Sequence, residues 1–284
     1  MELTDELLDI EALERSSASL ATSYQAASPF PHMVLDGVLR SEAVERAYAE
    51  FEDTDPETWT NYLHVNERKF AATDAGTWGL TLQAVADALM SDRFVSFLAS
   101  VTGIDHLVPD PTMDGGGLHR SVTGGYLNVH ADFTAHHVQQ SWHRRVNLLL
   151  YLNRDWQPEW GGDLQLWATD MSHCVESIAP IGNRMVVFTT SESSYHGHPD
   201  PMTCPPEVAR QSLALYYFTE ESKPPVRPTS YRARPTDRKT SAAAIYADSQ
   251  ALHLYDVVKR RFRISDDAIS PWLGRINRFR RPRP

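Results

Sequence analysis

The chain has 284 residues, 42% hydrophobic and 23% charged, which is ordinary for a globular protein that can bury a sizeable core. No apolar run approaches the ~20 residues that span a bilayer, and with a net charge of −10 we expect neither a membrane nor a nucleic-acid partner. The two cysteines, Cys174 and Cys204, indicate no disulfide framework, and the acidic N-terminus does not resemble a signal peptide, so a cytoplasmic setting is expected.

The first part of the chain is expected to combine helices with two short strands. Residues 4–26 are predicted to form one or two helices outside the main fold. The run PFPHMVLDGVL is predicted to be a strand that enters a helix, with Ser41 as the N-cap of that helix. Residues 66–73 are expected to contribute another strand.

A helix and a glycine-rich segment are expected next. Residues 80–102 are predicted to form one helix that ends at Gly103, because glycine readily adopts the left-handed conformation that closes a helix. Residues 114–125 lack the Gly-Lys-Ser/Thr ending of a phosphate loop, so no nucleotide site is expected there. We expect a mobile flap at the mouth of a site, from which His119 could reach a substrate.

The centre of the chain is rich in strands. Residues 125–219 contain closely spaced alternating segments, with turns at 160–162 and 181–183 and no helical pattern between them. Short strands with regular turns indicate an antiparallel double-stranded β-helix, or jelly roll. The predicted fold class is therefore α+β with a mainly β core and flanking N- and C-terminal helices.

The chain is expected to form one catalytic domain with an extension. The domain is predicted over residues 1–222, with its core at about 125–219, and the extension over residues 223–284. Residues 223–239 are rich in Pro and Arg and are predicted to form a linker or an extended strap.

The extension is expected to be helical and basic. Helices are predicted at 241–263 and 266–279, the second capped by Ser265. Between Val257 and Pro284 there are nine Lys or Arg residues against two Asp residues. We expect this tail to dock on the acidic body rather than to bind an anionic partner, and to be dispensable for the chemistry.

Four residues carry the clearest chemistry: His130, Asp132, His196 and Arg210. An isolated His-x-Asp pair is common by chance, but here the four occur in order on strand-like segments. Two imidazoles and one carboxylate on one face of an octahedral iron(II) ion leave three positions for a bidentate 2-oxo acid and O2. An Arg can then hold the far carboxylate of that acid through two hydrogen bonds.

Strand alternation predicts which neighbours accompany the metal ligands. His130 and Asp132 are two apart in GGYLNVHADF, so they project from one face. Tyr126 and Asn128 share that face and are expected to line the cavity as substrate contacts.

The same alternation predicts the pocket for the 2-oxo acid. Ser212 shares a face with Arg210 and could reach the same carboxylate. In RVNLLLYLN, alternation places Arg145 and Asn147 on one face with Tyr151, which is expected to be a third donor.

The sequence resembles the prolyl 4-hydroxylase-like branch of the iron(II)/2-oxoglutarate-dependent oxygenases in the runs RRVNLLLYLNRDWQPEWGGDLQLW, IGNRMVVFTT, HGHPDP and RQSLALYYF. The resemblance is strong from about Tyr126 to Thr219 and weaker upstream. It is closest in character to ribosomal-protein prolyl hydroxylases and related bacterial enzymes.

The resemblance implies a role for each matching residue. It implies that iron(II) is bound by His130, Asp132 and His196. It also implies that the C5 carboxylate of the co-substrate 2-oxoglutarate is bound by Arg210, Ser212 and Tyr151.

The other histidines leave alternatives open. Alternation does not separate His196 from His198, which lie two apart, and only the family position favours His196 as the ligand. His198 is then expected at the substrate mouth. His136, His137 and His143 are expected in an exposed loop or at a strand edge, with contact to substrate at the rim as the alternative.

The expected reaction is hydroxylation of an unactivated C–H bond, coupled to conversion of 2-oxoglutarate and O2 to succinate and CO2. Asp132 argues against halogenation, since related halogenases have a small residue there; desaturation and epoxidation stay open. The main hypothesis is a small metabolite, natural product or amino acid as substrate. A peptidyl-prolyl hydroxylase is the first alternative. The second alternative is a jelly-roll metal-binding protein that does not activate O2. Arg210, Ser212 and Tyr151 argue against it, because such a protein needs no site for 2-oxoglutarate.

Overall fold

The structure is a computed structural model that describes residues 6–262, with side chains described as far as residue 251. Its strands, in chain order, are β1 (His32–Asp36), β2 (Thr60–His64), β3 (Glu67–Ala72), β4 (Val108–Pro109), β5 (Gly117–Ser121), β6 (Tyr126–Ala131), β7 (Trp142–Tyr151), β8 (Leu164–Trp167), β9 (Cys174–Ile178), β10 (Arg184–Thr189), β11 (His196–His198), β12 (Arg210–Glu220) and β13 (Ser230–Tyr231). The helices are α2 (Ile10–Arg15), α3 (Ser17–Ala26), α4 (Ser41–Glu52), α5 (Leu80–Met90), α6 (Asp92–Thr102) and α7 (Lys239–Phe262), with short 3-10 turns η1 (Pro56–Thr58), η2 (Ala75–Thr77) and η3 (Pro158–Trp160).

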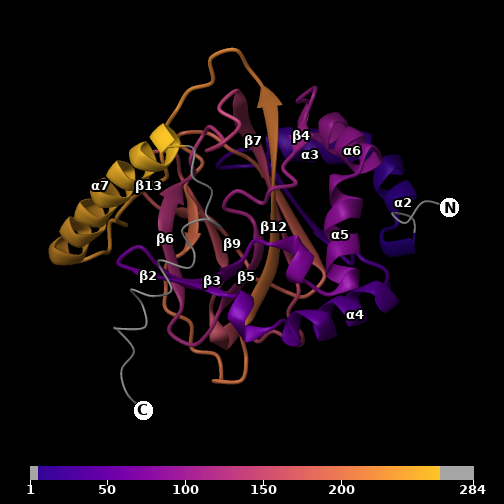
Figure 1. Cartoon of the computed structure of the whole chain (residues 1–284), viewed down its shortest axis with the longest axis horizontal. Helices are drawn as coiled ribbons and strands as arrows, with labels where there is room; N and C mark the ends of the chain where they lie inside the picture. Colours follow the sequence, from indigo (N-terminus) through magenta and orange to yellow (C-terminus); the bar gives the residue numbers. More distant parts are fainter. Residues whose placement is uncertain (1–5, 263–284) are drawn as a thin grey trace.

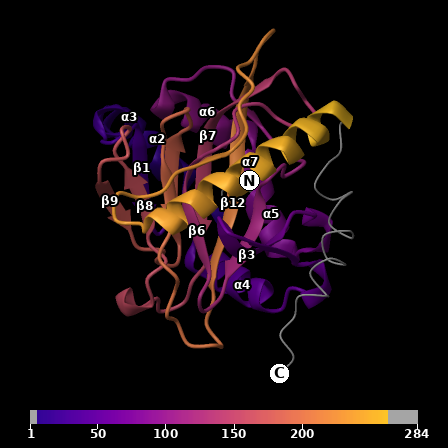
Figure 2. The ribbon, with the colours of Figure 1, turned by 90° about the vertical axis from the view of Figure 1, so that its left-hand side faces the viewer.

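The strands form one curled antiparallel sheet of 13 strands in the order β1-β10-β7-β12-β5-β3-β6-β11-β8-β9, with β13 added to β6, β2 to β3 and β4 to β12. Helices α2 to α6 cover one side of this sheet, and α7 lies at the other side of the molecule, next to β13 and β6 (Figures 1 and 2). The predicted mainly β jelly roll with flanking helices is confirmed.

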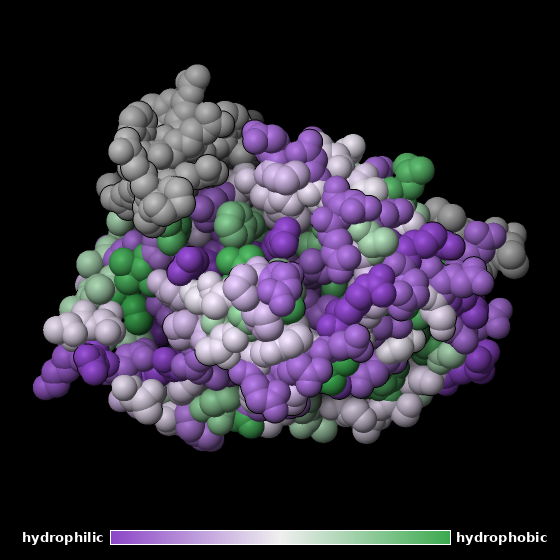
Figure 3. Space-filling model, turned by 90° about the horizontal axis from the view of Figure 1, so that it is seen from below, coloured by the Kyte–Doolittle hydropathy of each residue, from purple (hydrophilic) through white to green (hydrophobic). Residues whose placement is uncertain are grey.

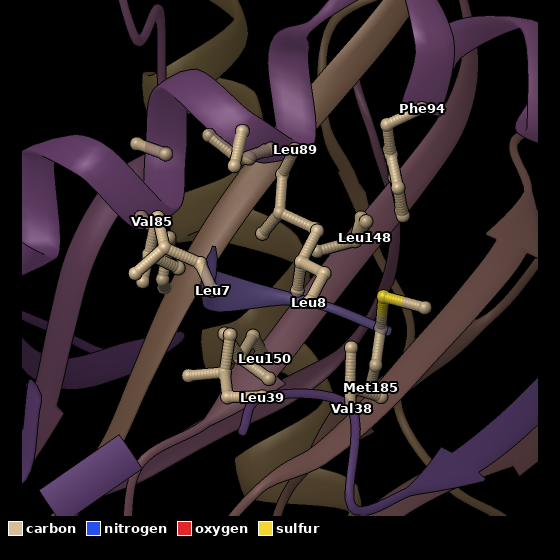
Figure 4. Close-up of a cluster of buried hydrophobic side chains, with 14 of the residues drawn as sticks. Leu7, Leu8, Val38, Leu39, Val85, Leu89, Phe94, Leu148, Leu150 and Met185 are labelled. Atoms are coloured by element: carbon tan, nitrogen blue, oxygen red, sulfur yellow. The ribbon is translucent and has the colours of Figure 1, made fainter. Parts of the chain in front are cut away.

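Alternation along the central strands separates a helix-facing side from a cavity-facing side. On β7, Leu148 and Leu150 are fully buried in the core beneath the helices, whereas Asn147 and Leu149 line the cavity. The core therefore fixes the strands whose other face forms the site. Part of it appears in Figure 4, which labels Val85, Leu89, Phe94, Leu148, Leu150 and Met185.

Two predicted helix boundaries need correction. The helix expected over 80–102 is two helices, because Ser91 has an extended backbone and its side chain accepts a hydrogen bond from the Phe94 N–H, which caps α6. Gly103 ends α6 with a φ of 68°, as predicted. Ser41 is the first residue of α4 rather than its cap; Arg40 holds the cap position without a side-chain hydrogen bond.

The prediction of a mobile flap at residues 114–125 is wrong. Residues 117–121 form β5, which lies inside the sheet between β12 and β3. A Cβ atom on Gly117 would lie 2.5 Å from the Ala72 carbonyl oxygen, and one on Gly116 would lie 2.7 Å from that of Ala214. These glycines therefore allow close approach of neighbouring backbones rather than mobility.

The predicted strap after residue 223 lies along β6. β13 pairs with β6, and the Thr134 N–H donates to the Arg227 carbonyl oxygen while the Arg232 N–H donates to that of Val129. The helix predicted at 241–263 is α7. The helix predicted at 266–279 and its cap lie outside the described residues, as do the side chains of the basic tail.

The surface seen from below is mostly hydrophilic, with hydrophobic residues scattered among the described atoms (Figure 3). Within residues 6–262, no helix is both long enough and apolar enough to cross a membrane.

Candidate metal centre and co-substrate pocket

The three predicted metal ligands lie together inside the curl of the sheet. The pairing of β11 with β6 sets His196 opposite His130, and Asp132 follows directly after β6. The Nε2 atoms of His130 and His196 each lie 3.4 Å from an Asp132 carboxylate oxygen. One donor atom from each residue lies within 4.8 Å of the others. This is the donor set of a non-haem iron(II) centre.

Both histidines are prepared to act as ligands. The Nδ1 atom of His130 lies 2.9 Å from the Asn128 carbonyl oxygen, and that of His196 lies 2.9 Å from the Ser194 carbonyl oxygen. A carbonyl only accepts, so Nδ1 carries the proton and Nε2 keeps its lone pair for a metal. Burial lowers the pKa of His196 to about 4, despite the opposing charge of Asp132, so its imidazole is neutral near pH 7.

Asp132 is oriented by two residues of β7 that the sequence interpretation did not assign to the site. The Asn147 side-chain amide donates to Oδ2 at 2.7 Å, and the Arg144 guanidinium lies 3.1 Å from the same oxygen. Burial alone would raise the pKa of Asp132, but Arg144 and the two histidines hold it well below its usual range. The carboxylate therefore stays ionised in a buried setting, as a metal ligand must.

Arg144 occupies the position that alternation predicted for Arg145. The pairing of β7 with β12 skips Arg145, since Val146 pairs with Tyr217 and Arg144 with Phe218. Such a β-bulge adds one residue to a strand and reverses the faces beyond it. Arg144 is consequently 1% exposed and lines the cavity, with its guanidinium carbon 3.4 Å from the Tyr216 ring centroid.

A second bulge displaces Tyr126 and Asn128, which alternation had placed in the cavity. Between the pairs His196–His130 and His198–Leu127, β6 has one residue more than β11. Leu127 therefore lines the cavity, and neither Tyr126 nor Asn128 is among its lining residues. Both instead donate hydrogen bonds to the Val65 carbonyl oxygen in the β2–β3 turn.

Arg210 is held at the start of β12 on the cavity wall. Its Nε donates to the Gly162 carbonyl oxygen at 2.7 Å, and its Nη2 donates to the Tyr151 hydroxyl at 3.0 Å. Ser212 lines the same cavity, two residues along. Tyr151 is fully buried behind Arg210 and is not among the lining residues, so it supports the guanidinium. The remaining guanidinium N–H groups can donate hydrogen bonds to a carboxylate.

His198 and His119 also line the cavity but lie outside the metal cluster. His198 is 4% exposed, and among the described residues its Nδ1 atom has no hydrogen-bond partner. Burial and the nearby Arg210 lower the pKa of His198 well below its usual range, and burial lowers that of His119 to about 3. Both imidazoles are therefore neutral hydrogen-bonding groups inside the pocket.

The expectation of exposed positions for His136 and His137 is wrong. His136 is 1% exposed and His137 6%, and the Nδ1 of His137 lies 2.6 Å from the Asp114 carboxylate. Asp110 lies 3.4 Å from Nε2 of His136. These pairs anchor the segment after the metal ligands to the loop before β5. His143 is not at a strand edge, because it lies near the start of β7 between Thr219 of β12 and Ala135. Its Nδ1 atom lies 2.8 Å from a Glu221 carboxylate oxygen.

A further wall of the cavity was not predicted from the sequence. β2 and β3 contribute Tyr62, His64, Glu67 and Lys69, and the strap contributes Tyr231. The Tyr231 ring centroid lies 5.3 Å from that of His130. The only local indication of this wall was the pair of charged residues Glu67 and Lys69, which are two apart in the strand predicted over residues 66–73.

Comparisons with known proteins agree with this geometry. Residues 116–218 match the sequence profile of the 2OG-Fe(II) oxygenase superfamily, and they include all three residues of the metal cluster and Arg210. Over 247 residues, or 83% of this chain, the sequence is 26% identical to prolyl 3-hydroxylase OGFOD1 of Mus musculus. The match covers 42% of that relative, so this chain spans less than half of its length.

Two solved structures share the fold. A prolyl-4-hydroxylase of Pseudomonas putida has a TM-score of 0.53 at 18% identity, with 71% of this chain and 99% of that chain covered. A prolyl hydroxylase of Trichoplax adhaerens, in complex with a hypoxia inducible factor oxygen degradation domain peptide fragment, has a TM-score of 0.54 at 18% identity, with 74% and 92% covered. The expected requirement for iron(II), 2-oxoglutarate and O2 is confirmed by the family match and the His-Asp-His cluster.

Proposed function

Because this chain belongs to the 2OG-Fe(II) oxygenase superfamily, in its prolyl 4-hydroxylase-like branch, we propose that it hydroxylates a prolyl residue of a peptide or protein. The similarity to a prolyl 3-hydroxylase carries this proposal, since it extends over 83% of the chain and not only over the metal-binding core. It favours the peptidyl alternative over the small metabolite that was the main expectation from the sequence.

The residues of the cavity have distinct parts in this reaction. We assign His130, Asp132 and His196 as the iron(II) ligands; the bound metal, with 2-oxoglutarate and O2, supplies the oxidation of the C–H bond. Arg210 binds the C5 carboxylate of 2-oxoglutarate and so orients its other end. Arg144 keeps the Asp132 carboxylate ionised and oriented toward the metal position.

The proposal is tested by supplying iron(II), 2-oxoglutarate and O2 with a panel of Pro-containing peptides and, separately, of amino acids and other metabolites. We expect peptide-dependent succinate release and a mass gain of one oxygen atom on proline, absent when proline is replaced by alanine. Succinate release coupled only to a metabolite would contradict the peptidyl substrate while leaving the oxygenase assignment intact.

A further inference from the structure

The inner face of β3 places an ion pair inside the reaction cavity. Glu67 and Lys69 are two apart, so both project from the cavity side of the strand. The Lys69 Nζ atom lies 3.1 Å from the Glu67 Oε2 atom, and the two side chains are 16% and 9% exposed. The pair is therefore largely removed from water but open to a ligand in the cavity.

This ion pair is difficult to explain by stability alone. Burying two charges costs free energy that their attraction only roughly repays, so an apolar pair would stabilise the fold at least as well. An ammonium group has three N–H donors. Among the described residues, Glu67 is the hydrogen-bonding partner that the structure shows for Lys69. The ammonium also lies 5.7 Å from the Tyr62 ring centroid, a contact that uses no hydrogen-bond acceptor, so N–H donors remain for a group that enters the cavity.

Lys69 and Arg210 lie on different strands of the cavity wall, with β5 between them. Burial lowers the pKa of Lys69, but the nearby Glu67, Tyr216 and Asp132 raise it overall, so its ammonium stays charged inside the cavity. β5 separates β3 from β12, so the strands that carry Lys69 and Arg210 are about 10 Å apart. The two cations can then bind two different ligands.

We propose that Lys69 is a specificity-determining residue that donates a hydrogen bond to a backbone carbonyl oxygen of the polypeptide beside the target proline. This inference rests on the proposed function. A prolyl residue has no backbone N–H, so at that residue the substrate backbone offers only carbonyl acceptors to the enzyme. Glu67 already balances the charge of Lys69, and the balanced pair suits a neutral carbonyl better than a second carboxylate.

Glu67 acts here as a positioning residue. Its other oxygen lies 2.9 Å from Nε2 of His64, whose Nδ1 lies 2.9 Å from a carboxylate oxygen of Asp248 in α7. The Tyr231 ring packs edge-on against His64, with centroids 6.3 Å apart. The chain of contacts from α7 to Lys69 therefore holds the ammonium in place within the cavity.

The test uses the full chain and the most active peptide from the panel above. Lys69→Met should lower kcat/KM for the peptide at least about tenfold, as loss of a hydrogen bond to a charged group predicts. The unfolding midpoint should fall, because Glu67 loses a buried partner. The KM for 2-oxoglutarate and peptide-independent succinate release should stay near wild type, which shows that the variant is folded. Lys223→Met, at an exposed lysine, is the matched control. Lys69→Arg should recover part of the loss.

A modified peptide makes the test specific for a carbonyl. Replacing the carbonyl oxygen of proline, or that of the preceding residue, by sulfur weakens one acceptor at a time. One of these thioamides should lower kcat/KM for wild type but add nothing in Lys69→Met, since the two changes remove the same contact. Additive effects at both positions would overturn the proposal, and so would a raised 2-oxoglutarate KM as the only defect. Absence of peptide turnover in wild type would instead overturn the proposed function.

Discussion

At the scale of single residues, the site depends on buried groups whose charge state is set by their neighbours. Arg144 is the clearest case: it is 1% exposed, lies over the Tyr216 ring and contacts the carboxylate of Asp132. Because burial opposes ionisation of Asp132, removing Arg144 would weaken the metal centre without removing a ligand.

Loss of His196 should abolish iron binding, whereas loss of His198 should not. His196→Ala removes one of three donors and leaves a weak two-ligand site, while His198 lies outside the cluster. Equilibrium binding of iron(II) under anaerobic conditions measures both variants. Iron loss in His198→Ala together with retention in His196→Ala would reverse the assignment.

Arg210→Ala should raise the 2-oxoglutarate requirement steeply while iron still binds. Loss of one side of a buried charge-assisted pair costs about 2–5 kcal/mol, and Arg210→Lys should recover only part because lysine cannot present two parallel donors. The KM for 2-oxoglutarate is the measurement, with Arg46→Ala at an exposed arginine as the control. An unchanged KM in Arg210→Ala would refute the clamp.

At the scale of elements, strands set the site and their bulges decide which residues face it. One extra residue in β6 brings Leu127 into the cavity, and one in β7 brings Arg144 there. Helix α7 and the strap add the last wall. Their attachment includes the contact between Asp248 and His64, an imidazole whose pKa is raised above its ordinary value by Glu67 and Asp248.

The attachment of α7 should weaken as the pH rises above neutrality. Burial lowers the pKa of His64, but Glu67 and Asp248 together raise it above its ordinary 6.5. The protonated imidazole therefore stabilises the folded contact fully below pH 6.5, and this contribution is lost as the pH rises through the raised pKa. The protection factors of the amides in residues 239–251, which are exchange rates corrected for the intrinsic effect of pH, should be smaller at about pH 9 than at about pH 6.

Two variants check that His64 is responsible for this pH dependence. His64→Gln should remove most of it, because glutamine does not titrate. His173→Gln, at an exposed histidine, should leave it unchanged. An identical pH dependence in His64→Gln would show that another group controls the attachment of α7.

At the scale of the whole molecule, the C-terminal part is joined to the reaction cavity. Residues Pro228, Thr229 and Tyr231 line it, and β13 continues the sheet beside β6. A catalytic domain ending at residue 222 stays a prediction, but residues beyond 222 line the cavity, so the expectation of dispensability is kept here for the basic tail alone.

Two truncations separate the strap from the tail. A chain ending at residue 222 should lose peptide-dependent turnover, since a wall of the cavity beside His130 is removed. A chain ending at residue 262 should retain it, because every lining residue remains. Succinate release with and without peptide is measured for both, after circular dichroism has shown that they are folded. Full turnover in the shorter chain would confirm the original boundary.

The sequence by itself determined the chemistry and the kind of fold. His130 with Asp132, two apart on a strand, and Arg210 with Ser212 follow from local alternation and order, and the regular turns between short strands indicate the jelly roll. Alternation left His196 and His198 open, and the family resemblance favoured His196. The tertiary structure alone decided the rest of the cavity. Bulges arise from pairing between distant strands, so period-two alternation misplaces Asn128 and Arg145. The positions of β3, β5 and the strap likewise depend on contacts far apart in the chain, which is why the wall containing Lys69 and Tyr231 was not predicted.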